Sequence, residues 1–169
     1  MQSKTNIFKH QAYLKFLNKK ELLVQDALSC ISILLRDSFC KAYQLESRIL
    51  ICHALRMSFE ELILSQKVLK KEERKVLKNL LLRRVIKEPI SYITQKKEFF
   101  SLEFFVNKKV LIPRNDTESL IDAVLNNTNH DIVGNILELG VGSGCIIISL
   151  LKWLKNSTAV GVDICKKAL

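Results

Sequence analysis

The chain has 169 residues, of which 48% are hydrophobic and 26% are charged, and its formal net charge at pH 7 is +10. This apolar fraction is enough for a packed core, which excludes a wholly disordered chain. No apolar run reaches the roughly 18 residues that a membrane-spanning helix needs, and residues 1–6 lack the hydrophobic region of a signal peptide. We therefore expect a globular, cytoplasmic protein.

The basic residues are unevenly placed. Residues 1–109 hold 22 Lys and Arg against 11 Asp and Glu, whereas residues 110–169 hold 5 against 6. A basic N-terminal part can attract nucleic acid or an acidic protein. The alternative is a Lys-rich, solvated surface without a partner, which we favour because aromatic residues are not interleaved with the charges.

The cysteines and histidines predict no disulfide and no metal site. The five cysteines are odd in number and form no Cys-x-x-Cys pair. In a reducing compartment such cysteines behave as small buried hydrophobic residues. Cys145 begins a predicted helix, where a thiol pKa can fall, yet nothing else marks it as a nucleophile. His53 has no second histidine nearby to complete a metal site.

The first half of the chain has a helical pattern. Residues 1–20 are a polar, Lys-rich extension with one short amphipathic stretch at 12–17 and no assigned function. From Glu21, apolar residues recur every three or four positions, as in helices that bury one face. Further helices are expected at about 44–55, 59–65 and 71–86. We therefore predict a small helical bundle over 21–95.

The pattern changes after Pro89 to aromatic and β-branched residues. The runs 102–106 and 110–112 flank three polar residues at 107–109, which predicts a β-hairpin with its turn there. We expect this hairpin to link the two halves of the chain over 96–113.

A helix is expected directly after the hairpin. Asn115 is followed three residues later by Glu118, and an apolar periodic run comes next. This spacing has the form of a capping box, so the helix is predicted to start at Asn115.

The sequence Ile136 to Leu151 is typical of a strand, a tight turn and a helix. An apolar run is followed by three alternating glycines, Gly140, Gly142 and Gly144, and then by a second apolar run at helical spacing. Such a loop lets the backbone approach a ligand at the helix N-terminus. A second strand at 158–162 ends in Asp163, whose carboxylate can accept hydrogen bonds from ribose hydroxyls. A nucleoside cofactor is the first hypothesis.

Three features favour S-adenosylmethionine among nucleoside cofactors. A dinucleotide fingerprint would have Gly or Ala at Cys145. A P-loop would need Gly-Lys-Ser/Thr, which does not follow here. Glu138 would repel a pyrophosphate but suits the ammonium group of a methionine moiety.

Four motifs follow one another along the chain: Glu88-Pro89-Ile90, Glu98-Phe99, Val110-Leu111-Ile112-Pro113-Arg114 with Thr117-Glu118, and Glu138-Leu139-Gly140-Val141-Gly142-Ser143-Gly144. In this order they resemble the HemK (PrmC) family, which methylates the glutamine side-chain amide in the Gly-Gly-Gln motif of peptide chain release factors. The resemblance covers about 25–169, and Asn115 stands where proline is usual.

The resemblance implies an α/β protein in three parts: a release-factor-binding helical bundle at 21–95, the hairpin linker at 96–113, and a Rossmann-like class I methyltransferase domain from 114 to 169. Two strands cannot cover their own faces and edges, so we expect this domain to be incomplete. The resemblance also implies the residues that bind S-adenosylmethionine, which are Gly140, Val141, Gly142, Ser143, Gly144 and Asp163.

The family's catalytic Asn-Pro-Pro-Tyr segment is not in this sequence, whose only prolines are Pro89 and Pro113. We therefore assign no catalytic residue and expect the chain as given to be inactive. Two alternatives remain open. One is a noncatalytic basic module that binds a release factor or RNA. The other is an RNA methyltransferase, or part of a fusion with a tRNA methyltransferase. The bundle and the Ile-Pro-Arg segment favour release factor methylation over the second alternative.

Overall fold

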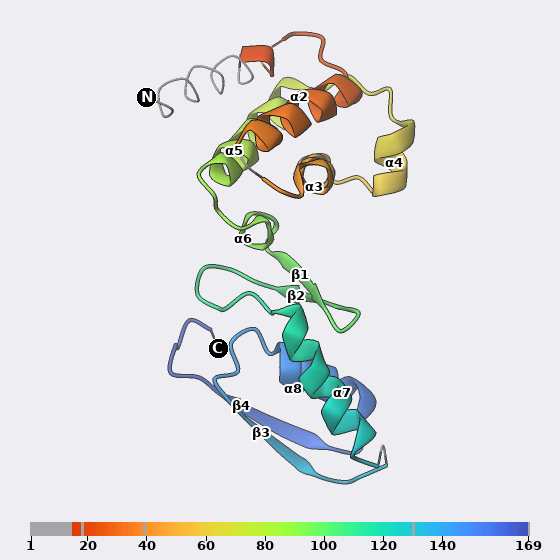
Figure 1. The fold of residues 1–169 in the computed structure, drawn as a ribbon, viewed down its shortest axis with the longest axis vertical. Helices are drawn as coiled ribbons and strands as arrows, with labels where there is room; N and C mark the ends of the chain where they lie inside the picture. The colour runs from red at the N-terminus through yellow and green to blue at the C-terminus, as the bar shows by residue number, and fades with distance from the viewer. Residues whose placement is uncertain (1–14, 18, 39, 130, 169) are drawn as a thin grey trace. The chain divides into compact units, whose positions relative to one another are not determined.

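The computed structural model describes residues 15–17, 19–38, 40–129 and 131–168. The chain divides into two compact units at Thr94 and Gln95, and each is described by itself (Figure 1). Within the described residues, no helix combines the length and apolar character that crossing a bilayer requires. Of the amphipathic stretch at 12–17, residues 12–14 lie outside the described residues, and Leu17 is buried in the core of the first unit.

The first unit is built from helices, as the apolar spacing predicts. The helix expected from Glu21 begins at Val24, and the next three lie within two residues of their expected bounds. The short α6, which follows Pro89, was not predicted. The helices are α2 (Val24–Asp37), α3 (Tyr43–Leu55), α4 (Phe59–Leu64), α5 (Lys71–Val85) and α6 (Ile90–Thr94).

One apolar core holds these helices together. The faces of α2, α3 and α5 that meet are fully buried, and burying each such side chain contributes about 1.5–3 kcal/mol. Ser47 is buried with them, and its hydroxyl lies 2.7 Å from that of Ser32, which satisfies both groups. The core includes Ile31, Leu34, Leu35, Leu50, Ile51, Leu77 and Leu81.

The C-terminal end of α5 has a Schellman motif. The amide of Glu88 donates to the carbonyl of Arg83 at 3.1 Å, and the amide of Lys87 donates to the carbonyl of Arg84 at 2.9 Å. Lys87 has φ of +68°, in the left-handed region where glycine is usual. The guanidinium of Arg83 also binds the Glu88 carboxylate through two hydrogen bonds of 2.9 and 2.7 Å, so the chain leaves α5 in a fixed direction.

The second unit begins with the hairpin, but its turn is not where the sequence predicted. Strand β1 (Lys96–Phe99) pairs antiparallel with β2 (Leu102–Phe105) through a two-residue turn at Phe100 and Ser101. Both turn residues have positive φ, +49° and +59°, as the favoured hairpin turns require. The predicted strand at 110–112 does not form, and 107–109 make only a local turn.

The predicted capping box at Asn115 is also wrong. Residues Asn115–Thr117 form a short 3-10 helix, η1, and helix α7 runs from Glu118 to Asn126. The side chains of Asn115 and Glu118 contact the hairpin instead of each other. Asn115 Oδ1 accepts from Lys97 Nζ at 2.8 Å, and Glu118 Oε1 accepts from the Phe100 amide at 3.1 Å. Both contacts hold the hairpin against the start of α7.

The last elements are β3 (Asn135–Leu139), α8 (Cys145–Trp153) and β4 (Thr158–Val162), in agreement with the predicted strand, helix and strand. The two strands pair in parallel, with Asn135 opposite Thr158 and Leu139 opposite Val162. Helix α8 packs on one face of the pair and on α7. The other face exposes four apolar side chains: Leu137, Leu139, Val160 and Val162.

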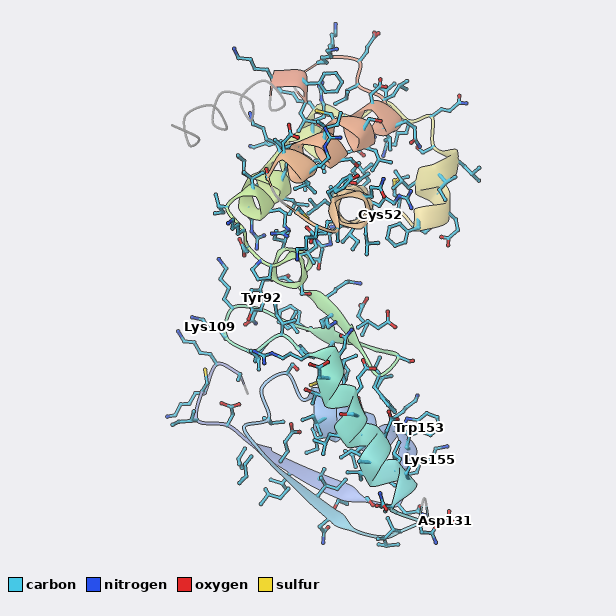
Figure 2. The ribbon with its side chains drawn as sticks, viewed as in Figure 1. Cys52, Tyr92, Lys109, Asp131, Trp153 and Lys155 are labelled. Carbon is cyan, nitrogen blue, oxygen red and sulfur yellow. The ribbon has the colours of Figure 1, made fainter. Side chains whose placement is uncertain are left out.

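Side chains from the hairpin and the two helices form the core of the second unit. Phe99 is fully buried and meets Phe104 edge to face, with ring centroids 6.2 Å apart, an arrangement that aromatic rings prefer. Ile121 of α7 and Leu150 of α8 complete this core. At the C-terminal end of α8, Trp153 is about half exposed (Figure 2).

Candidate functional site

The three glycines between β3 and α8 form the loop that the sequence predicted, and β4 holds it in place. Gly140, Gly142 and Gly144 have φ of +78°, +53° and +74°, a region that other L residues rarely adopt. The carbonyl of Val162 accepts hydrogen bonds from the amides of Gly140 at 2.7 Å and Val141 at 3.0 Å. We call residues 140–144 the glycine loop.

Asp163 lies against the glycine loop, as its position after β4 predicted. Its Oδ1 accepts from the Cys165 amide at 2.8 Å and its Oδ2 from the Gly142 amide at 2.9 Å. The hydrogen bond from Cys165 and, to a smaller extent, that from Gly142 hold the pKa of the Asp163 carboxyl below its usual value. The side chain is therefore ionised at neutral pH and acts only as an acceptor, with lone pairs left for hydroxyl donors.

Glu138 reaches α8 from strand β3. Its Oε2 accepts from the Ile147 amide at 3.0 Å, which satisfies one of the free donors in the first turn of the helix. Burial raises the pKa of the Glu138 carboxyl, and the hydrogen bond from Ile147 opposes this shift. The structure therefore gives Glu138 a helix-capping role that the sequence analysis did not predict.

The expectation that the cysteines are buried holds fully only for Cys30, because the other four are partly exposed. Burial raises the pKa of the Cys145 thiol despite its place at the start of α8, so the thiolate is not favoured there. Burial also raises the pKa of Cys30, to about 11. All five cysteines are free thiols, and within the described part of the chain no group of His, Cys, Asp and Glu side chains could hold a metal ion.

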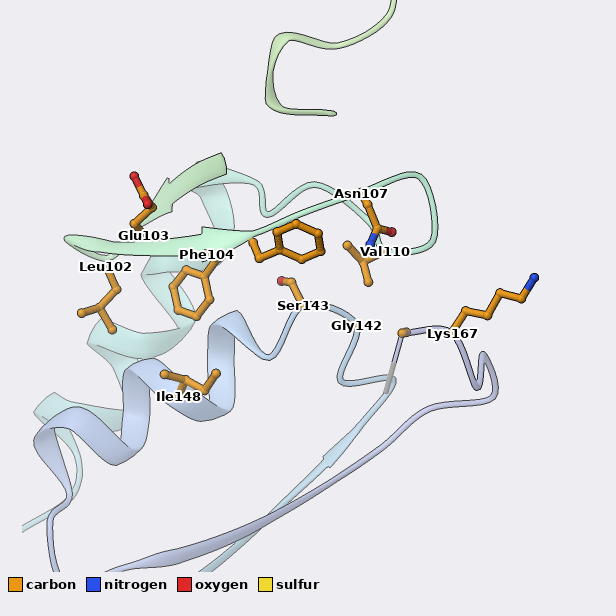
Figure 3. A pocket seen from close by; sticks show the side chains of 11 residues that line it. Leu102, Glu103, Phe104, Asn107, Val110, Gly142, Ser143, Ile148 and Lys167 are labelled. Carbon is orange, nitrogen blue, oxygen red and sulfur yellow. The ribbon is translucent and has the colours of Figure 1, made fainter. Parts of the chain in front are cut away.

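A hollow of about 600 Å³ lies between the hairpin and the glycine loop, and we call it the hairpin–loop hollow. Figure 3 shows Leu102 and Phe104 of β2 on one side and Ser143 with Ile148 of α8 on the other. Its volume is within the range of small-molecule sites, about 300–1,000 Å³. The sequence analysis did not assign Phe104, Asn107 or Lys167 to a site. The hairpin pattern was a signal for the position of the first two, and Lys167 had none.

The glycine loop has room for a ligand to approach its backbone. A Cβ atom built on Gly140 would meet nothing within 4 Å, and one on Gly142 would meet only the Gly140 carbonyl at 3.9 Å. Open space above the backbone, an ionised acceptor at Asp163 and a neighbouring hollow fit a nucleoside with hydroxyl groups. They do not supply the run of lysine and hydroxyl side chains that a triphosphate requires.

Known proteins match both units of the chain. A family model described as the PrmC N-terminal domain matches residues 26–94, which include most of α2 and all of α3 to α6. Over these residues the first unit is similar to a PrmC N-terminal domain. The resemblance to the HemK (PrmC) family inferred from the motifs is thereby confirmed, as is the expected fold class, a helical bundle followed by a hairpin and the start of an α/β domain.

The chain is also similar to curated methyltransferases. A bifunctional methyltransferase of Rickettsia bellii is 43% identical over 148 residues, which cover 72% of this chain and 27% of the relative. A release factor glutamine methyltransferase of Buchnera aphidicola is 41% identical over 127 residues, covering 75% and 46%. A protein of that name from Geobacter sulfurreducens is 41% identical over 97 residues, covering 57% and 34%.

The chain therefore spans less than half the length of these curated relatives. The names of these relatives describe methyltransferases. The six residues expected to bind the cofactor are present together at the ends of β3 and β4, whereas an Asn-Pro-Pro-Tyr segment is not part of the sequence.

Proposed function

We propose that the second unit binds S-adenosylmethionine and that the chain is the N-terminal part of a methyltransferase acting on the glutamine side-chain amide of the Gly-Gly-Gln motif in release factors. One observation carries this proposal. The glycine loop, whose backbone is open to a ligand, is hydrogen-bonded to a carboxylate that remains ionised and can accept ribose hydroxyls.

Each part of the site has a role in this proposal. S-adenosylmethionine supplies a methyl group on a positively charged sulfur. Asp163 accepts the ribose hydroxyls, and Val141, Gly142 and Ser143 contact the methionine part. The nitrogen of a glutamine amide is a poor nucleophile because its lone pair is delocalised, so acceptors must hold and orient its hydrogens. The family takes these acceptors from Asn-Pro-Pro-Tyr, and we therefore propose that the 169 residues alone do not transfer the methyl group.

The first unit is proposed to bind the release factor. Support comes from the match of residues 26–94 to a PrmC N-terminal domain and from the names of the relatives in Buchnera and Geobacter. Residues 1–94 hold 18 Lys and Arg against 9 Asp and Glu, and this excess gives the first unit a positive field that can attract an acidic partner. RNA would be attracted by the same field, so RNA binding is an outcome that the experiments below distinguish.

A second candidate function rests on the relatives named bifunctional methyltransferase. The chain covers 27% of the Rickettsia bellii protein of that name. We propose that the same glycine loop can serve a longer protein with a second methyltransferase activity, as in the fusion with a tRNA methyltransferase considered from the sequence.

Cofactor binding can be tested on the 169-residue chain with S-adenosylhomocysteine as the probe. We expect the amide NMR signals of Gly142 and Ser143 to shift when it is added, because their backbone lies at the proposed site. Asp163→Ala removes the ribose acceptor and should weaken binding by about tenfold or more. Asp131→Ala, at an exposed aspartate before β3 (Figure 2), is the matched control and should leave binding unchanged. Unshifted loop amides at saturating probe would contradict the proposal.

The release factor proposal needs a separate assay. The chain is mixed with a release factor and, in a parallel experiment, with an RNA hairpin similar in size to the release factor. Complex formation is measured at several salt concentrations. Binding of the release factor alone supports the proposal, whereas binding of RNA with a steep salt dependence favours the basic module. Detectable methylation of the Gly-Gly-Gln glutamine by this chain would refute the proposed lack of activity.

A further inference from the structure

Gly161 is the last residue but one of β4 and lies against Val141 of the glycine loop. A Cβ atom built at this position would come within 2.6 Å of Val141 Cγ2 and 2.9 Å of Val141 Cβ, closer than non-bonded carbons approach. Its φ is not in the left-handed region, so the requirement for glycine here is space and not backbone conformation.

The contact between Gly161 and Val141 belongs to a set of contacts through which β4 shapes the loop. The carbonyl of the next residue, Val162, accepts hydrogen bonds from the amides of Gly140 and Val141. The carboxylate of Asp163 accepts a hydrogen bond from the amide of Gly142. Gly161, Val162 and Asp163 thus contact residues 140–142 of the loop. Of these contacts, only the one between Gly161 and Val141 requires a residue without a side chain.

We propose that Gly161 is a positioning residue for cofactor binding: its lack of a side chain lets Val141 sit against β4, and this fixes the place of the Gly142 amide on Asp163. The inference rests on the proposed function for its link to S-adenosylmethionine. Any side chain at residue 161 pushes Val141 away from the strand, and the loop amides move with it. Packed groups of this kind cannot absorb an added methyl group without a shift.

The test compares two glycine-to-alanine variants of the 169-residue chain. Gly161→Ala adds the methyl group beneath Val141. Gly134→Ala is the matched control, because a Cβ atom there would meet only Ser157 Oγ at 3.7 Å, an ordinary contact. The readouts are the amide NMR shifts of residues 140–144 without ligand and the affinity for S-adenosylhomocysteine. The first readout does not depend on cofactor binding, so failure of the proposed function and failure of this inference are distinguishable.

We expect Gly161→Ala to shift the loop amides and to lower the affinity about tenfold, while Gly134→Ala changes neither. Adding Val141→Gly to Gly161→Ala removes the Val141 Cβ and both Cγ atoms that the new methyl group would meet. We expect the loop amide signals of this double variant to return most of the way to their positions in the parent chain. The double variant also keeps the test decisive where the single variant fails to fold. Loop shifts in Gly161→Ala no larger than in the control, or no return of the signals on adding Val141→Gly, would overturn the inference.

Discussion

At the scale of single residues, Asp163 combines two tasks in one carboxylate. Each oxygen accepts one backbone amide, from Cys165 and from Gly142, and each still has a free lone pair. The side chain therefore fixes the glycine loop before a ligand arrives and offers the remaining lone pairs to hydroxyl groups. Asparagine at this position has the same shape but only one acceptor oxygen, so it can accept only one of the two backbone amides.

The loop contact of Asp163 should depend on pH in one direction. Its pKa is lowered in the folded chain, so the contact is complete above the ordinary carboxyl value of about 3.9 and is lost as the pH falls through the lower folded value. We expect the amide proton shift of Gly142 to titrate with a midpoint below about 3.9. Asp163→Asn should abolish this titration, and a midpoint above that value in the parent chain would contradict the assignment.

At the scale of elements, the end of α5 departs from the residue that its geometry favours. Lys87 occupies the left-handed position of a Schellman motif, where a Cβ atom is costly. The bond pattern forms all the same, because the amides of Lys87 and Glu88 both find carbonyl partners in the last turn.

Lys87→Gly should stabilise the first unit. Relief of the left-handed conformation outweighs the added chain entropy, and we expect the free energy of unfolding to rise by about 0.5–1 kcal/mol. Denaturant unfolding followed by helical circular dichroism measures the change. Lys87→Ala is the control for the lost charge and should alter stability by less than about 0.5 kcal/mol. Equal effects of the two variants would show that charge, and not backbone conformation, decides.

The hairpin and α7 are joined through the carboxylate of Glu118. Its hydrogen bond to the Phe100 amide fixes a turn in which both residues have positive φ. Glu118→Ala leaves this partly buried amide without its acceptor, and we expect a loss of about 1–2 kcal/mol in stability. Hydrogen exchange of the Phe100 amide should accelerate at the same time. Asp122→Ala, at an exposed acid on the same helix, should change neither quantity.

The sequence predicted those elements whose signal is local. The apolar spacing of α2, α3 and α5 and the glycine pattern between β3 and α8 are complete within one segment, so both were predicted correctly. The hairpin turn was misplaced because Phe100 and Ser101 are not residues typical of such turns. The capping box failed because Glu118 found a partner in the hairpin, a contact that helix spacing cannot reveal.

The candidate site could be predicted only in part for the same reason. Gly140 to Gly144 and Asp163 stand at a spacing that implies a nucleoside loop. The hairpin–loop hollow brings Phe104 and Asn107 close to Ser143, Ile148 and Lys167, which lie far from them in the sequence. Such pairing depends on how the second unit folds. The capping role of Glu138 could not be predicted either, because it depends on α8 packing against β3, the strand that carries Glu138.

At the scale of the whole molecule, one face of the β3–β4 pair has no cover among the described residues. Leu137 and Val160 are register partners on this face, with 64% and 61% of their surfaces exposed. Together with Leu139 and Val162 they form an apolar patch on a sheet with two open edges, a combination that favours association.

Placing charges on this face should reduce association of the chain. In the double variant Leu137→Glu with Val160→Lys, a neighbouring pair of opposite charges replaces two apolar side chains of the patch. We therefore expect the sedimentation coefficient of this variant to rise less with protein concentration than that of the parent chain. Asn135→Glu with Thr158→Lys is the matched control, since it adds the same charges to register partners that are already polar. Equal behaviour of the two variants would show that the patch does not drive association.

Trp153 is the one tryptophan of the sequence, and it lies half exposed at the end of α8 in the second unit. Fluorescence excited selectively at tryptophan therefore observes the surroundings of α8 and carries no direct signal from the helices before residue 95. Circular dichroism at helical wavelengths is weighted toward those helices instead. When both optical signals are followed during one denaturant titration, they report the unfolding of the two units separately, and no label has to be attached.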